Sequence, residues 1–240
     1  MFFLFSGEGP TDMGSGLSPG QISEGEQFQH GPMAAIVDQI VETQWGYSIL
    51  HTDGSVGFVS EGALAAEAGD LKATKKSIRL PGPKTPKETR FFFNSARLLA
   101  RIAKHLGNER TIDVIAILFR DSDGTGSADR GLWDDKQQSM LDGFAEEGFM
   151  TGVPMVPKPK SEAWLLCALK ANPYQSCAKL EDRSGNDKSP KALKKELAKL
   201  VPGEVTRELL LNLVTTRTVD IDRIDMPSFS TFRTRLEEVL

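Results

Sequence analysis

A buried β-strand that ends in two acidic residues is the feature that most constrains this chain. The run that ends at Phe119 is apolar and rich in β-branched residues, which is typical of a central strand covered on both faces of a parallel sheet. Asp121 and Asp123 follow it, and a glycine-rich turn begins at Gly124. Because ligand sites in open α/β sheets form at the carboxyl ends of strands, this stretch predicts an α/β fold with its chemistry at that edge.

The two aspartates form a candidate metal site. Asp121 and Asp123 are two residues apart, so in an extended chain their side chains point the same way. Two carboxylates on one side of a strand end repel each other unless a cation lies between them or one is protonated. Oxygen ligands of this kind suit Mg²⁺ or Mn²⁺. The alternative is an Asp- and Gly-rich turn that holds no metal.

Composition limits the class of protein. The chain has 240 residues and a net charge of −4, so it has no overall basic field that would attract nucleic acid, although local patches still could. Cys167 and Cys177 are the only cysteines, and we expect no disulfide and a reducing, cytoplasmic compartment. No apolar run reaches about 18 residues, which predicts no membrane helix. The apolar start of the chain is expected to be a first strand and not a signal peptide.

The rest of the chain alternates between strand and helix patterns. Residues 13–30 lack periodicity and are expected to be a surface loop. Residues 64–82 show little pattern and are rich in lysine and arginine, which suits a solvated face or a contact with phosphates. The predicted strands cover residues 2–5, 47–50, 56–59 and 149–156, and the predicted helices cover residues 32–43, 85–105, 133–147, 163–169, 192–200, 204–214 and part of 227–240.

The order of these elements predicts two parts. Residues 1–170 are expected to form a metal-binding catalytic domain with a mainly parallel sheet flanked by helices, and residues 171–240 a helical C-terminal lobe. In the predicted helix 192–200 the lysines fall on the solvent side of an amphipathic pattern; they are Lys191, Lys194, Lys195 and Lys199.

A second acidic turn follows the first strand. Glu8 lies between two glycines, which free the backbone to turn and leave the carboxylate unencumbered. Asp12 follows four residues later and is a candidate ligand, helix cap or solvent-facing acid. Taken alone, Glu8 is equally well explained as a solvated loop acid.

A third acidic residue opens a later helix. Glu162 follows Ser161, which is expected to be the helix N-cap, and Lys158 and Lys160 come just before them. One glutamate with an Asp-x-Asp pair can hold divalent metal, which positions a phosphodiester and activates a water molecule. A nearby lysine would neutralise the negative charge that develops on the phosphoryl group.

These motifs, in this order, resemble the TOPRIM fold of topoisomerases, primases, recombination mediators and the overcoming-lysogenization-defect (OLD) nucleases. The resemblance rests on the Glu8-Gly9 turn after an N-terminal strand and on the apolar strand before Asp121-Ser122-Asp123. The segment Glu-Gly-Pro-Thr-Asp at 8–12 is most similar to the OLD-like branch, and residues 158–164 are similar to its Lys-plus-Glu segment and to small stand-alone TOPRIM-like bacterial proteins encoded beside an ATPase. The likeness covers about residues 1–170, with an unusually long segment between the first turn and the aspartate pair.

The resemblance implies a Mg²⁺- or Mn²⁺-dependent nuclease that cleaves phosphodiester bonds in nucleic acid, more often DNA. By it, Glu8 is a metal ligand or general acid–base, Asp121 and Asp123 are metal ligands, and Glu162 supports a second metal. Asp12 joins this ligand set, and Lys160 or Lys158 lies near the phosphate. The chain lacks a Gly-x-x-x-x-Gly-Lys-Ser/Thr loop, so the ATPase of such a system would be a separate protein. A role in bacterial antiphage defence follows from the family alone.

Two other interpretations remain open. The motif Asp121-Ser122-Asp123-Gly124-Thr125 also fits a haloacid-dehalogenase-type phosphatase, in which Asp121 would be the nucleophile and Thr151 and Lys158 would serve the later motifs. Against that, the motif lies near the middle of the chain and leaves the turn at Glu8 without a role. The third interpretation is a non-catalytic, partner-binding subunit.

Overall fold

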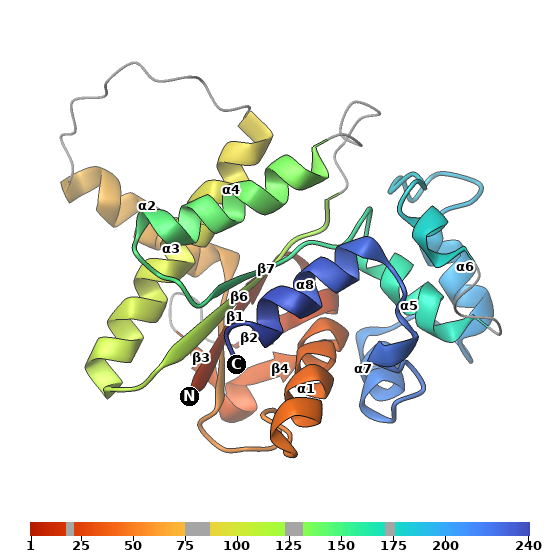
Figure 1. Cartoon of the computed structure of the whole chain (residues 1–240), viewed down its shortest axis with the longest axis horizontal. Helices are drawn as coiled ribbons and strands as arrows, with labels where there is room; N and C mark the ends of the chain where they lie inside the picture. The colour runs from red at the N-terminus through yellow and green to blue at the C-terminus, as the bar shows by residue number, and fades with distance from the viewer. Residues whose placement is uncertain (18–21, 75–86, 123–131, 171–175) are drawn as a thin grey trace.

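The computed structural model describes residues 1–17, 22–74, 87–122, 132–170 and 176–240, and it is an α/β protein (Figure 1). Its centre is a five-stranded sheet in the order β3-β5-β1-β6-β7. The last four strands of this order are parallel, and only β3 at the edge is antiparallel, to β5. The predicted mainly parallel sheet flanked by helices is therefore confirmed.

The described elements follow the chain in this order: β1 Phe2–Gly7, a π-helix Gly9–Met13, β2 Gly14–Gly16, β3 Ser23–Glu24, a 3₁₀ turn Gly25–Gln27, β4 Phe28–His30, α1 Pro32–Trp45, β5 Val56–Val59, α2 Glu61–Thr74, α3 Lys87–Arg110, β6 Val114–Phe119, α4 Trp133–Glu146, β7 Gly152–Met155, α5 Ser161–Leu169, a 3₁₀ turn Cys177–Leu180, α6 Leu193–Leu200, α7 Arg207–Thr215, a 3₁₀ turn Ile221–Arg223 and α8 Pro227–Glu237. None of the described helices has both the length and the apolar character needed to span a bilayer.

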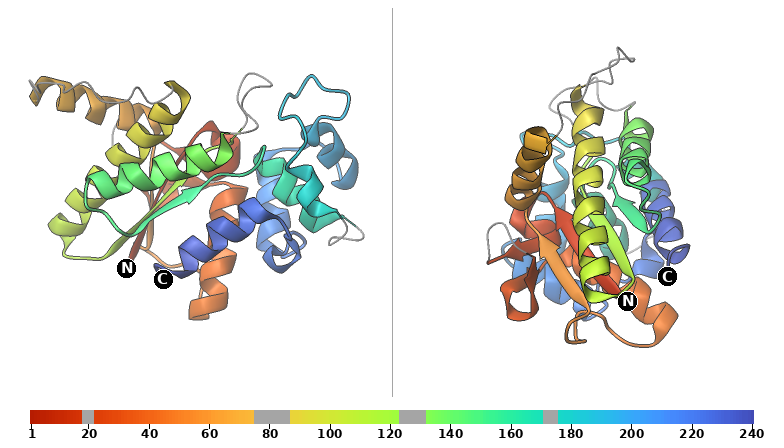
Figure 2. Two further views of the ribbon diagram at one scale, coloured as in Figure 1. Left: turned by 45° about the horizontal axis from the view of Figure 1, so that its top comes forward. Right: turned by 90° about the vertical axis from the view of Figure 1, so that its left-hand side faces the viewer.

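Alternation along the strands divides the core into two layers. On β1, Phe3 and Phe5 face one apolar cluster, which also contains buried residues of α1, α5, α7 and α8. Phe2 and Leu4 face a second cluster, formed with α2, α3 and α4. Successive side chains of a strand point to opposite faces, so a run of phenylalanines supplies both layers. The two layers of helices are visible on either side of the sheet (Figure 2).

The connections between the strands create a topological switch point at the carboxyl ends of β1 and β6. The chain leaves β1 through α1 on one face to reach β5, then returns through α2 and α3 on the other face to reach β6. The strand order therefore reverses between β1 and β6. In doubly wound folds, ligands bind outside the carboxyl ends of the strands at this reversal point.

One predicted strand is wrong. Residues 47–50 form turns, because the buried carboxylate of Asp38 on α1 organises them. Its Oδ1 accepts hydrogen bonds from the backbone N–H of Ile49 at 2.7 Å and of Leu50 at 3.2 Å, and its Oδ2 accepts from the Ser48 hydroxyl. Short apolar segments can satisfy their backbone in this way without joining a sheet.

The two segments without periodicity contain more structure than expected. Within 13–30, β2 and β4 pair in antiparallel fashion, and Phe28 of β4 is buried. From Glu61 the chain forms α2, whose start is capped by the Ser60 hydroxyl, which accepts from the Ala63 N–H at 3.2 Å. The first segment has few apolar residues, and in α2 the apolar residues are not gathered on one face, so neither segment gives a periodic signal.

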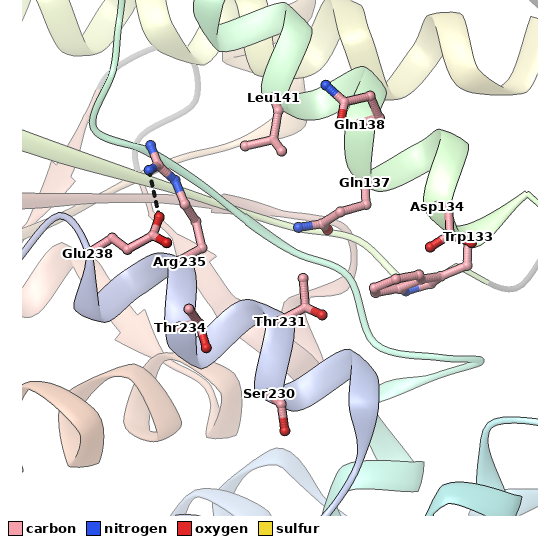
Figure 3. A pocket seen from close by; sticks show the side chains of 10 residues that line it. All are labelled: Trp133, Asp134, Gln137, Gln138, Leu141, Ser230, Thr231, Thr234, Arg235 and Glu238. Carbon is pink, nitrogen blue, oxygen red and sulfur yellow. Dashed lines mark hydrogen bonds and ion pairs between the residues drawn. The ribbon is translucent and has the colours of Figure 1, made fainter.

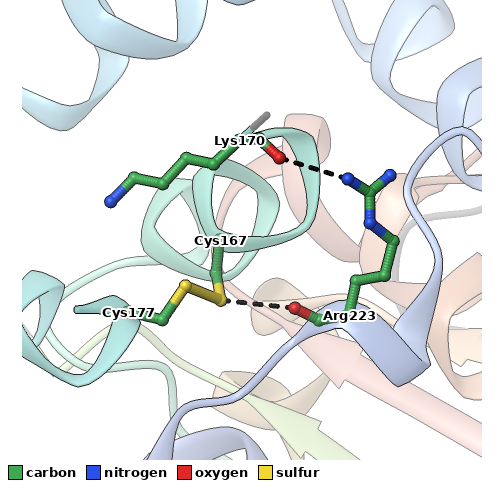
Figure 4. Close-up of a disulfide and its surroundings, with 4 residues drawn as sticks. All are labelled: Cys167, Lys170, Cys177 and Arg223. Atoms are coloured by element: carbon green, nitrogen blue, oxygen red, sulfur yellow. Dashed lines mark hydrogen bonds between the residues drawn. A yellow bond between two sulfur atoms is a disulfide. The ribbon is translucent and has the colours of Figure 1, made fainter. Parts of the chain in front are cut away.

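The expectation of no disulfide is also wrong, since Cys167 and Cys177 are bonded (Figure 4). Their Cα atoms lie 5.5 Å apart and the bond ties α5 to the following 3₁₀ turn. The Sγ atom of Cys167 lies 3.4 Å from the carbonyl oxygen of Arg223, whose guanidinium donates to the carbonyl of Lys170. The bond removes the sequence argument for a reducing compartment, because that argument assumed free thiols.

Candidate functional site

The carboxyl ends of β1 and β6 bring two predicted site residues into direct contact. Glu8 follows β1 and Asp121 follows β6, and the backbone N–H of Asp121 donates to Oε1 of Glu8 at 2.8 Å. The next residue, Gly9, has a φ of 74°, a left-handed conformation that glycine adopts without a steric penalty. This turn directs the Glu8 carboxylate back over the sheet edge.

A buried arginine, which the sequence did not point to, holds Glu8 in place. Arg120 immediately follows β6 and its side chain is 4% exposed. The guanidinium donates to Oε2 of Glu8 at 3.2 Å and pairs with the carboxylate of Glu61 at the start of α2. It also lies 4.0 Å from the ring centroid of Phe91 on α3. The sequence signal for this role is the position of Arg120 directly after a buried strand and next to Asp121. An arginine at such a position is buried only with anionic partners, so nearby acids would be expected to pair with it.

Ser161 joins the other acidic residues. Its backbone N–H, at the start of α5, donates to Oδ1 of Asp121 at 3.0 Å. Its hydroxyl donates to Oδ1 of Asp12 at 2.5 Å. The predicted N-cap role of Ser161 is therefore wrong: Lys160 occupies the cap position, and the Asp121 carboxylate satisfies the helix N-terminus from another strand.

Asp12 and Glu162 are carboxylates with little compensation for their burial. Burial raises the pKa of Asp12, and the hydroxyls of Ser161 and Thr11 and the charges of Lys160 and Lys194 only partly oppose it. Burial also raises the pKa of Glu162, and the nearby negative charge of Asp12 adds to the effect. Among the described residues, Oε2 of Glu162 is a buried oxygen with no hydrogen-bond partner.

The two predicted lysines lie in different surroundings. Lys160 is mostly buried, forms an ion pair with Asp187 at 3.2 Å and acts electrostatically on both Asp12 and Glu162. The ammonium of Lys158 lies 6.0 Å from the ring centroid of Trp133 on α4. Of the two, Lys160 is thus the one beside the carboxylates.

A second buried cation braces the chain behind Asp121. Lys136 on α4 is 2% exposed, and its ammonium donates to the backbone carbonyl of Ser122 at 2.8 Å. The Ser122 hydroxyl donates to the carbonyl of Pro159, and its N–H to the carbonyl of Pro157. These bonds fix the backbone just after the strand end and join it to the segment that carries Glu162. The helical pattern of α4 gave no indication that Lys136 is buried.

The metal-ligating geometry expected from the sequence is only partly described. Asp123 lies outside the described residues, so its place beside Asp121 is not given. Within the described parts of the chain, no three Asp, Glu, His or Cys side chains are grouped so as to hold a metal ion. The oxygens of Glu8, Asp12 and Asp121 instead accept hydrogen bonds from neighbouring donors.

The oxygen-rich donor set nevertheless fits a hard divalent cation. Asp12 and Glu162 are close enough for one charge to raise the pKa of the other, and Oε2 of Glu162 is buried without a hydrogen bond in the described structure. A cation between such groups would remove both the repulsion and the desolvation penalty.

A separate cleft of about 610 Å³ lies between α4 and α8 (Figure 3). Its two acids, Asp134 and Glu238, are exposed, and Glu238 is paired with Arg235. Arg235 also donates to the carbonyl of Gly152, so its charge is already engaged. The cleft therefore offers less chemistry than the carboxylates; it is lined by Trp133, Asp134, Gln137, Gln138, Leu141, Ser230, Thr231, Thr234, Arg235 and Glu238.

Glu8, Asp12, Asp121 and Glu162 thus come together at one sheet edge from segments that are far apart in the sequence. Comparison of the chain with protein-family models, with curated proteins and with solved structures gave no match in any of the three.

Proposed function

We propose that this protein is a divalent-metal-dependent nuclease of the TOPRIM type that hydrolyses phosphodiester bonds in nucleic acid. The proposal rests on four acids that lie together where the strand order reverses: Glu8, Asp12, Asp121 and Glu162. Ser161 donates to both Asp12 and Asp121, and the backbone of Asp121 donates to Glu8. The order of these acids along the chain matches the motifs that resemble the OLD-like branch.

In this proposal, Asp12, Asp121 and Glu162 hold the cation. Their support is the donor type, the raised pKa of Asp12 and Glu162, and the unbonded buried oxygen of Glu162 within the described structure. When bound, a divalent cation supplies Lewis-acid polarisation of the phosphate and a more acidic water molecule.

The protein's own groups position the substrate and move protons. Glu8, whose side chain is 40% exposed, is the group we assign to proton transfer, and Arg120 keeps its carboxylate oriented toward Asp121. Lys160 lies where its ammonium would offset negative charge on the reacting phosphate.

The test is a cleavage assay on plasmid DNA and on single-stranded DNA and RNA with Mg²⁺ or Mn²⁺. We expect metal-dependent cutting by the wild type and a loss of about 10²- to 10³-fold in Asp121→Asn, as for removal of a charge-stabilising group. The matched control is Asp142→Asn, the same change at an exposed position of α4, which should cut normally. Release of phosphate from a small phosphomonoester without any cutting would instead favour the phosphatase with Asp121 as nucleophile.

The resemblance extends the proposal to a separate ATPase partner and to antiphage defence. If the partner is required, the isolated chain should be inactive and should cut only after the co-encoded ATPase is added. Inactivity in both states would favour the non-catalytic, partner-binding interpretation.

A further inference from the structure

A basic surface borders the acidic site, although the whole chain carries a net charge of −4. Between positions 183 and 199 there are six basic residues and two acidic ones. Both acids are paired: Glu196 accepts from Arg183 at 2.6 and 2.9 Å, and Asp187 accepts from Lys160 at 3.2 Å. These two acids thus offset the charges of Arg183 and Lys160, and the lysines of the segment give it a positive surface. We call them the α6 lysines, and they are Lys188, Lys191, Lys194, Lys195 and Lys199.

The packing of α6 sends these lysines into solvent. Leu193 and Leu197 are buried against the core, with 2% and 0% exposed surface. All five lysines are exposed; Lys188 and Lys191 precede α6, and Lys194, Lys195 and Lys199 make its solvent side mostly basic. Lys195 and Lys199 are four residues apart, a spacing at which like charges repel and lower helix stability by about 0.2–0.5 kcal/mol. A polyanion on this face would remove that repulsion.

The basic face lies next to the carboxylates. Lys194 and Lys160 are the two cations whose charges lower the pKa of Asp12 against the effect of burial. Helix α6 packs on α5, the helix whose first turn carries Glu162. Of the α6 lysines, Lys194 is therefore the one whose charge acts on the site, and α6 lies beside α5 on the same side of the molecule (Figure 1).

We propose that the α6 lysines form the surface that binds the nucleic-acid backbone and guides it to the carboxylate site. A cluster of acids repels a phosphate polymer, so a site of this kind needs adjacent cations to hold the strand. Lysines act through charge and counterion release without reading sequence. This inference rests on the proposed function, because it names where the substrate of that site binds.

The test measures binding without cleavage, so that its failure is separate from failure of the nuclease proposal. Fluorescence anisotropy with a labelled 20-nucleotide strand and its duplex, in EDTA, compares wild type with the double variant Lys191→Gln/Lys194→Gln. We expect Kd to rise about tenfold at low salt. The slope of log K against log salt should become less steep by about 1.8 for the duplex and 1.4 for the single strand.

The control is Lys104→Gln/Arg110→Gln, which removes the same charge from α3 at the opposite end of the molecule (Figure 1). This variant should bind like the wild type. Equal weakening by both double variants would mean that only net charge matters, and it would overturn the inference. Unchanged oligonucleotide binding in the α6 variant, with weaker binding to vesicles rich in anionic lipid, would assign the face to a membrane surface and would also overturn it.

Discussion

The two halves of the site balance their charges in opposite ways. In the half built on β1, β6 and α2, the guanidinium of Arg120 lies between Glu8 and Glu61. In the half built around α5, Asp12 and Glu162 are partly buried, and the adjacent ammonium of Lys160 is shared with Asp187.

The difference separates the acid held by a buried arginine from the acids that we propose bind the cation. A further cation would add little electrostatic stabilisation to acids that are paired with a buried arginine, because their charge is already compensated. Acids whose pKa is raised by burial and by each other gain from any cation that enters. Carboxylates only a few residues apart in sequence, Glu8 and Asp12, therefore take different roles.

The largest effect should come from removing the buried cation of the paired half. Arg120→Ala leaves Glu8 and Glu61 without their partner and removes the contact with Phe91, and we expect the free energy of unfolding to fall by about 3 kcal/mol. Urea unfolding measures this. Arg110→Ala, which breaks the exposed pair with Glu24, is the matched control and should lose less than about 1 kcal/mol. Equal losses would mean that burial does not distinguish the two arginines.

The second effect concerns Asp12 and Glu162, in the half of the site built around α5. Mg²⁺ at 100 times its Kd should raise the free energy of unfolding of the wild type by about 2.7 kcal/mol. Glu162→Gln keeps the shape of the side chain but removes its charge, so this variant should lose most of the gain. Thermal unfolding with and without Mg²⁺ measures the difference. A gain of the same size in both proteins would place the cation elsewhere.

The third effect is a pH dependence. Because burial raises the pKa of Asp12 in the folded state, its contribution to stability is fully present below the pKa of the unfolded chain and is lost as the pH rises through the folded value. Asp12→Asn lacks this loss and can keep the bonds to Ser161 and Thr11, since both hydroxyls can reorient.

At pH 7 we therefore expect Asp12→Asn to be more stable than the wild type by on the order of 1 kcal/mol, and the difference should vanish toward pH 4. Urea midpoints between pH 4 and 7 test this. A difference that stays constant with pH would show that the Asp12 carboxylate is not responsible.

The smallest effect should come from the outer acid of the paired half. Glu61 is 50% exposed, so Glu61→Gln should cost about 0.5 kcal/mol or less and leave cleavage unchanged. Glu8→Gln should cost a similar amount but remove most cleavage, because Glu8 accepts a hydrogen bond from the backbone of Asp121 and is the acid that we assign to proton transfer. Equal loss of cleavage in both variants would mean that both acids act merely by holding Arg120.

Local patterns predicted the strands that carry the site but not the contacts within it. The apolar runs of β1 and β6 and the glycines after β1 were enough to place Glu8 and Asp121 at strand ends. The bonds that organise these residues join groups that are far apart in the sequence: Arg120 to Glu8 across 112 positions and Ser161 to Asp12 across 149. No spacing rule relates such positions.

Errors arose where the decisive partner was distant or the apolar signal was weak. Residues 47–50 were expected to form a strand because the role of Asp38 in bonding their backbone is not visible in a pattern. The pairing of Cys167 with Cys177 depends on α5 and the next turn being packed together. Helix α2 was missed because its apolar residues are spread around the helix and give no amphipathic pattern.

The α/β class, the buried strands and the acids at their carboxyl ends can be read from the sequence, because periodicity and strand length are local properties. Packing then determines which acid lies against a buried arginine and which acids are partly buried beside each other. Burial, and with it the sign of each pKa shift, depends on what the rest of the chain packs around a carboxylate. Glu8 and Asp12 are neighbours in sequence, and only the fold places one against Arg120 and the other against Ser161.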